Sequence, residues 1–285
     1  MVRKLYKHEF AALFKWIIPI NLICLLISLV AKLFSVILDV TESTPIYFFN
    51  GIFLFAYGVS LISLAVITFA IVVSRFYKHL LSHEGYLTFT IPVSPIAHIV
   101  CKMVCGTIAT LISYFITGLS LGVIISSVSA SEGTNSVLKE IVWMLSEYWG
   151  FDVSLIPVHR VVMLALSYGM NIVVTTMSGL LFTYAAMALG QRSQKNRVAS
   201  AVGWYFIINI IRNTITSIFE FILMNAGRGS EEVLEESTLT MAESTMLYVN
   251  SLHISSVISQ IDAIIWGALF FWITSHMLTK KLNLE

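Results

Sequence analysis

Charged residues are scarce in this sequence. Asp, Glu, Lys and Arg together account for 12% of the 285 residues, whereas hydrophobic residues account for 57%. Ordinary soluble domains contain about a quarter charged and about half apolar residues. This balance excludes any combination of soluble domains, so the composition predicts an integral membrane protein. The net charge of +1 gives no reason to expect a nucleic-acid partner.

Groups for covalent or metal chemistry are also few. The three cysteines, Cys24, Cys101 and Cys105, lie in apolar stretches and cannot form a disulfide framework. We interpret them as structural thiols. His79 and His83 have a metal-compatible spacing but lack a third ligand, so we expect no metal site.

Catalytic motifs are missing as well. No glycine begins a G-x-x-x-x-G-K-[ST] loop, so the chain cannot cradle nucleotide phosphates by that route. The sequence also offers no nucleophile and base that would suit an intramembrane hydrolase. We therefore predict that the chain is not an enzyme, has no ATPase site of its own and binds no cofactor.

Long apolar stretches are what the sequence has in abundance. A membrane-spanning helix needs about 20 mostly apolar residues, and six stretches qualify. They predict an all-α integral membrane protein with one six-helix transmembrane domain over residues 17–285 and short helices in its two outer loops. The predicted spans are about 17–38, 47–73, 100–126, 159–188, 199–225 and 254–278.

The N-terminus carries a different pattern. Residues 2–14 place apolar side chains on one arc and mostly basic side chains on the other, with Glu9 as the exception. Such a basic amphipathic segment is typical of a helix that lies in the membrane interface. We predict an interfacial elbow helix over residues 1–16; the alternative is a frayed basic tail that only orients the protein.

Lys and Arg are distributed unevenly between the two sides of the membrane that alternating spans define. Twelve lie on the side of the two termini, and three, Lys139, Arg160 and Arg228, lie on the other. Cytoplasmic loops carry the excess of positive charge, so we expect both termini in the cytoplasm. No N-x-[ST] sequence occurs, in agreement with a bacterial source, and we expect the bacterial cytoplasmic membrane.

The segment between spans two and three is unlike an ordinary connection. Residues 75–95 mix charges with seven large apolar groups, which are too many to leave in water unless they face a partner or the membrane surface. One alternative is a helix end followed by a turn on the bilayer. The run RFYKHLLSHEGYLTFTIPVSPIAHIVCKMV resembles the first cytoplasmic loop of permease subunits of the ABC type-2 exporter family. Residues 188–202 resemble more weakly the basic link before span five of that family.

The resemblance implies a coupling helix in this segment, which inserts into a separate ABC ATPase subunit that binds ATP and Mg²⁺. It also implies a second permease subunit, identical or different. The most similar members are exporters of amphipathic peptides, such as the phenol-soluble modulin exporters of Gram-positive bacteria and antimicrobial-peptide resistance permeases. The residues expected to dock on the ATPase are His79, His83, Glu84, Gly85, Tyr86, Leu87 and Thr88.

Ionisable residues inside the predicted spans form a second candidate site. Each would cost about 2.5 to 3.5 kcal/mol near the helix centre if it faced lipid. Spans one and five each carry a polar stripe, which could border a translocation path between subunits, as the resemblance implies, or form hydrogen bonds within one subunit. The residues concerned are Asn21, Ser28 and Lys32 in span one, Asn209, Arg212, Asn213, Thr216 and Glu220 in span five, and Asp262 in span six.

Three of these charges are predicted to lie at a similar depth. Lys32, Arg212 and Asp262 are 13 to 16 residues from the cytoplasmic ends of their spans, or roughly 20 to 24 Å at 1.5 Å per residue. We therefore predict that Asp262 pairs with Lys32 or Arg212. The leading functional hypothesis is an ATP-driven exporter of an amphipathic peptide or similar hydrophobic substrate. The alternative is a secondary transporter in which these three residues form an ion relay.

Overall fold

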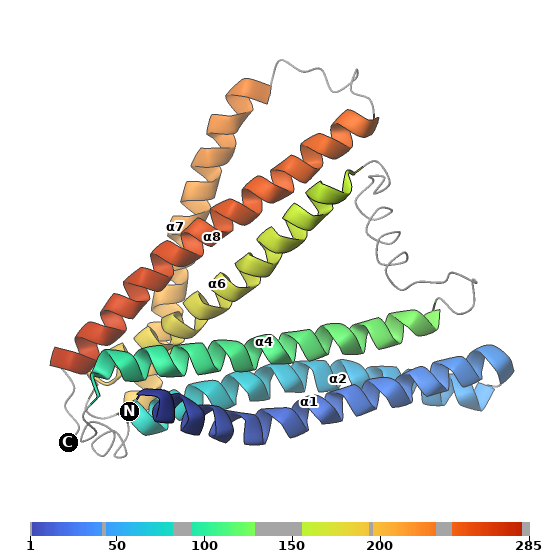
Figure 1. The fold of residues 1–285 in the computed structure, drawn as a ribbon, viewed down its shortest axis with the longest axis horizontal. Coiled ribbons are helices and arrows are strands. Elements are labelled where there is room, and N and C mark those ends of the chain that lie inside the picture. Colours follow the sequence, from blue (N-terminus) through green and yellow to red (C-terminus); the bar gives the residue numbers. More distant parts are fainter. Residues whose placement is uncertain are drawn as a thin grey trace. The chain divides into compact units, whose positions relative to one another are not determined.

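The computed structural model is almost entirely helical in the part that it describes, which comprises residues 2–41, 44–81, 93–128, 156–193, 196–231 and 241–280. Each of the six predicted spans lies within one long helix, and no strand occurs in these ranges (Figure 1). The helices are α1 (Val2–Thr41), α2 (Thr44–Phe76), α4 (Pro95–Val128), α6 (Val158–Gly190), α7 (Arg197–Glu231) and α8 (Met241–Lys280), with a π-helical turn, η1 (Tyr77–Leu81), directly after α2.

All six long helices are long and apolar enough to cross a membrane. Many large apolar side chains on these helices are exposed; the exposed fractions are 75% for Phe55, 67% for Phe115 and 66% for Trp272. Exposure of this kind is costly in water and favourable in lipid. The fold therefore confirms the all-α class and agrees with a multi-pass membrane protein.

The helices extend beyond the predicted spans. Helix α1 runs without a break from Val2 to Thr41 and includes Pro19, so residues 1–16 are not marked off as a separate elbow helix. The helical pattern of residues 2–14 continues directly into the apolar run of span one, and no turn residue separates the two. The interfacial position of this segment stays a prediction. The proposed coupling helix over residues 84–88, His83, and residues 129–155 and 232–240 of the two outer loops lie outside the described residues. Helices α7 and α8 extend into the second outer loop, to Glu231 and from Met241.

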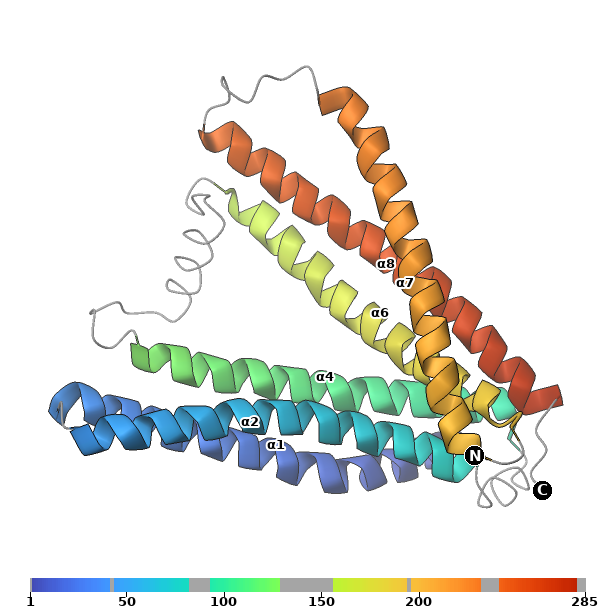
Figure 2. The ribbon, with the colours of Figure 1, turned by 180° about the vertical axis from the view of Figure 1, so that it is seen from behind.

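The chain divides into two compact units. The first comprises Met1–Arg75 and Val100–Trp149, and the second comprises Phe76–Ile99 and Gly150–Glu285. In the first unit, α1, α2 and α4 lie side by side (Figures 1 and 2). Contacts from Glu9 to Lys102 and from Asn21 to Ser113 make α1 and α4 parallel. Helix α2 runs in the opposite direction.

The second unit contains α6, α7 and α8. Helices α6 and α8 run parallel, since Ser167 contacts Ser256 near one end and Phe182 contacts Phe270 further along. Helix α7 returns in the opposite direction from its close approach to α6 (Figure 2). At that approach, a methyl group added to Gly190 would lie 2.5 Å from the Cα atom of Ala201. Glycine at this position therefore allows the two backbones to pack closely.

Candidate functional site

Residues 76–99 contain the predicted docking residues, and we call them the docking segment. Ion pairs hold the residues at its two flanks. Arg75 is in the last turn of α2, just before the segment, and Lys102 is in the second turn of α4, just after it. Lys102 Nζ lies 3.0 Å from Oε1 of Glu9, and Arg75 Nη1 lies 3.6 Å from the same oxygen. Lys102 Nζ also lies 3.5 Å from the backbone oxygen of Arg75. We call Glu9, Arg75 and Lys102 the basal ion cluster.

The basal ion cluster is largely removed from solvent. The exposed fractions of the side chains are 7% for Lys102, 12% for Glu9 and 22% for Arg75. A buried ammonium group is costly unless an opposite charge or hydrogen-bond acceptors surround it, and Glu9 supplies that charge. In the amphipathic pattern of residues 2–14, Glu9 is the exception, and that pattern does not predict its partners. One feature of the sequence could have drawn attention to Glu9: it is the only acidic residue before Asp39.

The start of the docking segment packs into the second unit. The rings of Phe76 and Tyr184 stack with their centroids 3.8 Å apart and their planes 5° from parallel. Both side chains are fully buried, as are Leu80 and Leu81 in η1. A π-helical turn is rare and occurs often at functional sites. Of the predicted docking residues, only His79 lies within the described part of the chain, and it is half-buried in this turn.

The polar stripe of span one forms hydrogen bonds inside the first unit. Asn21 is almost fully buried, and its Nδ2 donates to Ser113 Oγ at 3.0 Å and to the backbone oxygen of Ile17 at 2.8 Å. Ser28, also buried, donates to the backbone oxygen of Leu25. These two residues therefore have the second arrangement considered from the sequence, hydrogen bonding within one subunit. Lys32 is half-buried in the same helix.

The charge pair predicted within the spans is present between α7 and α8. Arg212 Nη2 lies 3.6 Å from Asp262 Oδ2, and Thr216 Oγ1 donates a hydrogen bond of 3.2 Å to Asp262 Oδ1. The prediction that Asp262 pairs with one of two cations is thus confirmed for Arg212. Around this group, Asn213 Nδ2 donates to Asn209 Oδ1 at 2.7 Å, and Glu220 is exposed.

A polar contact between α6 and α8 was not predicted. Ser167 Oγ donates to Ser256 Oγ at 3.0 Å, and Gln260 Nε2 donates to the backbone oxygen of Ser167 at 2.8 Å. Asn171 Nδ2 donates to the backbone oxygen of Ser256 at 3.1 Å. The spacing in the sequence could have indicated this contact. Ser167 and Asn171 are four residues apart, as are Ser256 and Gln260, and residues four apart share one helix face.

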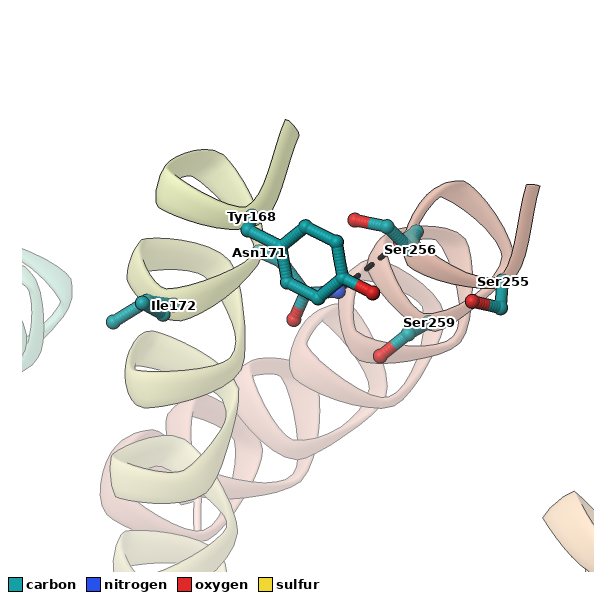
Figure 3. Close-up of a pocket in the computed structure, with 6 residues that line it drawn as sticks. All are labelled: Tyr168, Asn171, Ile172, Ser255, Ser256 and Ser259. Atoms are coloured by element: carbon teal, nitrogen blue, oxygen red, sulfur yellow. Dashed lines mark hydrogen bonds between the residues drawn. The ribbon is translucent and has the colours of Figure 1, made fainter. Parts of the chain in front are cut away.

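A pocket of about 290 Å³ opens beside this contact, as Figure 3 shows. Five of its six lining residues carry a polar side-chain group, although the helices around it are largely apolar. Sites of this kind in a membrane protein usually face protein or a wet cavity. The lining residues are Tyr168, Asn171, Ile172, Ser255, Ser256 and Ser259.

The assembled groups are suited to anchoring and positioning. Among the described residues, no cluster of three or more His, Cys, Asp or Glu side chains could hold a metal ion. The polar contacts instead join helices to one another at defined levels. Comparisons of this chain with protein-family models, with curated proteins and with solved structures gave no match.

Proposed function

We propose that this chain is the membrane-spanning permease subunit of an ATP-driven exporter of the ABC type-2 kind. The observation that carries the proposal is the way the two flanks of residues 76–99 are held. The cations that flank them are paired with Glu9, and Phe76 stacks on a fully buried tyrosine. A surface through which another protein moves membrane helices has to be attached to those helices, and these contacts attach the residues at the two flanks of the segment.

The sequence of the segment supports the same function. It has the composition of a partner-binding surface and resembles the ATPase-docking loop of that family. Because the chain has no phosphate-binding loop of its own, the energy would come from ATP and Mg²⁺ on a separate ATPase subunit. A second permease subunit would complete the membrane part. Both termini would lie in the cytoplasm, and the cargo would be an amphipathic peptide or a similar hydrophobic molecule.

The docking segment provides the direct test. Gly85→Pro and the double change Glu84→Lys with Tyr86→Ala are expected to abolish transport and co-purification with the ATPase, while the chain still inserts into the membrane. The matched control is Tyr114→Ala, which removes an aromatic group from the exposed face of α4 and should leave both intact. Full complex formation together with full transport-coupled ATP hydrolysis in both docking variants would contradict the proposal.

A secondary transporter is the second candidate, and the Arg212 and Asp262 pair favours it. Ion pairs inside membrane spans often belong to ion or proton relays. The two candidates differ in their energy source. Transport by membrane vesicles that have an ion gradient but no ATP would support the relay, whereas transport that requires ATP and persists after the gradient is collapsed would support the exporter.

A further inference from the structure

The chain passes between its two compact units at two points, and a cation of the basal ion cluster lies beside each point. The first passage is between Arg75 and Phe76, and the second is between Ile99 and Val100. Arg75 is directly at the first passage, and Lys102 lies within one helical turn of the second. Both cations pair with the carboxylate of Glu9 on a third helix, α1.

Glu9 is the residue that contacts both cations, and so it interacts with the chain beside both passages. Arg75 and Lys102 approach the same carboxylate oxygen, Oε1, so one side chain of α1 links the end of α2 to the start of α4. Among the described residues, Glu9 is the acid that both cations contact. If the carboxylate were lost, the Lys102 ammonium group, 7% exposed, would remain beside a second positive charge. Removing one partner from a buried ion pair is strongly destabilising for this reason.

The neighbouring residue has a different anchor. Phe76 follows Arg75 directly but stacks on Tyr184 of α6 within the second unit. Two consecutive residues are thus fixed to different helices, Arg75 to α1 and Phe76 to α6. A displacement of the docking segment must therefore act on both the ion pair of Arg75 and the ring stack of Phe76. The ionic anchor is the one that can exchange partners, since its two cations share one oxygen.

From this arrangement we infer that Glu9 is a positioning residue: it holds Arg75 and Lys102, which flank residues 76–99 in the chain, to α1, and so fixes both chain connections of the docking segment to the first helix. The consequence for transport rests on the proposed function, whereas the positioning itself does not. Motion of a docked ATPase would then reach α1 through Glu9. Loss of the carboxylate would uncouple the segment from α1 without removing the docking surface.

The first test needs no partner. Amide hydrogen exchange of the full chain in lipid nanodiscs is compared between the wild type and Glu9→Gln. We expect faster exchange in η1 and in the last turn of α2 and the first turns of α4, because local opening follows the loss of local contacts. Exchange near Ser35 and Asn50, which hydrogen-bond at the opposite end of the first unit, should not change.

Three further variants separate positioning from general destabilisation. Glu9→Asp keeps the charge and should restore most of the protection. The exchange Glu9→Lys with Lys102→Glu keeps the net charge of the cluster and should restore part of it. Lys7→Gln, which removes an exposed cation of the same helix, is the matched control and should have no effect. If Glu9→Gln fails to fold, Arg75→Gln removes one of the two cations and should increase exchange in η1.

The second test uses the complex. With the ATPase bound, Glu9→Gln should retain co-purification and ATP hydrolysis but lose most of the transport per ATP. Unchanged exchange in Glu9→Gln, or exchange that rises equally at both ends of the first unit, would overturn the positioning role whatever the ATPase does. If exchange changes as expected but the wild-type chain binds no ATPase, the proposed function fails and the positioning role of Glu9 stands.

Discussion

Replacing Asp262 by Asn tests whether the charge pair between α7 and α8 stabilises the second unit. The two side chains have nearly the same shape, so the change removes the negative charge and little else. Thr216 can still donate a hydrogen bond to the remaining amide oxygen. Arg212 would be left in the span without the carboxylate that now lies 3.6 Å from its Nη2.

The expected magnitude follows from the depth and burial of the pair. An arginine near the centre of a span costs about 2.5 to 3.5 kcal/mol in insertion measurements, and breaking a fully buried pair costs about 3 to 5 kcal/mol. The exposed fractions here are 26% for Arg212 and 21% for Asp262, and their closest charged atoms are too far apart for a strong hydrogen bond. We therefore expect Asp262→Asn to lower the free energy of unfolding by about 1 to 2 kcal/mol.

The assay is a double-mutant cycle with Arg212→Gln, read from reversible unfolding of the full chain in detergent or bicelles. The double variant should be more stable than the sum of the two single changes predicts. Exchanging the charges, Arg212→Asp with Asp262→Arg, should recover part of the loss. The argument is refuted if the single effects add to within about 0.3 to 0.5 kcal/mol, which is the range expected for independent sites, and the charge exchange recovers nothing.

Two further changes test packing in the second unit. Phe76→Ala should lower the free energy of unfolding by about 3 kcal/mol, because it removes a fully buried ring together with its stack on Tyr184. A loss below about 1 kcal/mol would contradict the anchoring role of this ring. Gly190→Ala should cost about 1 to 3 kcal/mol through overpacking against Ala201, whereas Gly179→Ala, with nothing within 4 Å of the added methyl group, should be close to neutral in the same unfolding assay.

The number of long helices could be predicted because membrane spans depend on the length and hydropathy of local sequence. All six apolar runs lie in such helices. Helix ends were predicted less well, since hydropathy marks the part of a helix that contacts lipid and not the point where its hydrogen bonds stop. Helix α8 is 40 residues long, although its predicted span is 254–278, and Ser256 and Gln260 of this helix hydrogen-bond to α6.

Side-chain partners could be predicted only where the energetic cost of an unpaired charge inside the membrane restricted the possible pairs. Within the spans, one carboxylate and two cations at similar depth left few combinations, and the Arg212 and Asp262 pair is one of them. The basal ion cluster was missed because the partners of Glu9 lie 66 and 93 residues away in sequence, on helices whose packing order hydropathy does not define. The stack of Phe76 on Tyr184 was missed for the same reason, since aromatic residues are common throughout the chain.

The polar residues of the spans can now be sorted by what they contact. In a membrane, helices gain little from hydrophobic burial against one another, so hydrogen bonds and close packing determine which helices pair. Asn21 serves this purpose within the first unit, where it donates to Ser113 of α4, and Arg212 and Thr216 contact Asp262 within the second. Glu220 differs, because it is exposed within a candidate span and has no hydrogen bond or ion pair to another described residue. An ionised carboxylate cannot be left against hydrocarbon at low cost, so we expect the face of α7 that carries Glu220 to meet water or another protein surface rather than lipid.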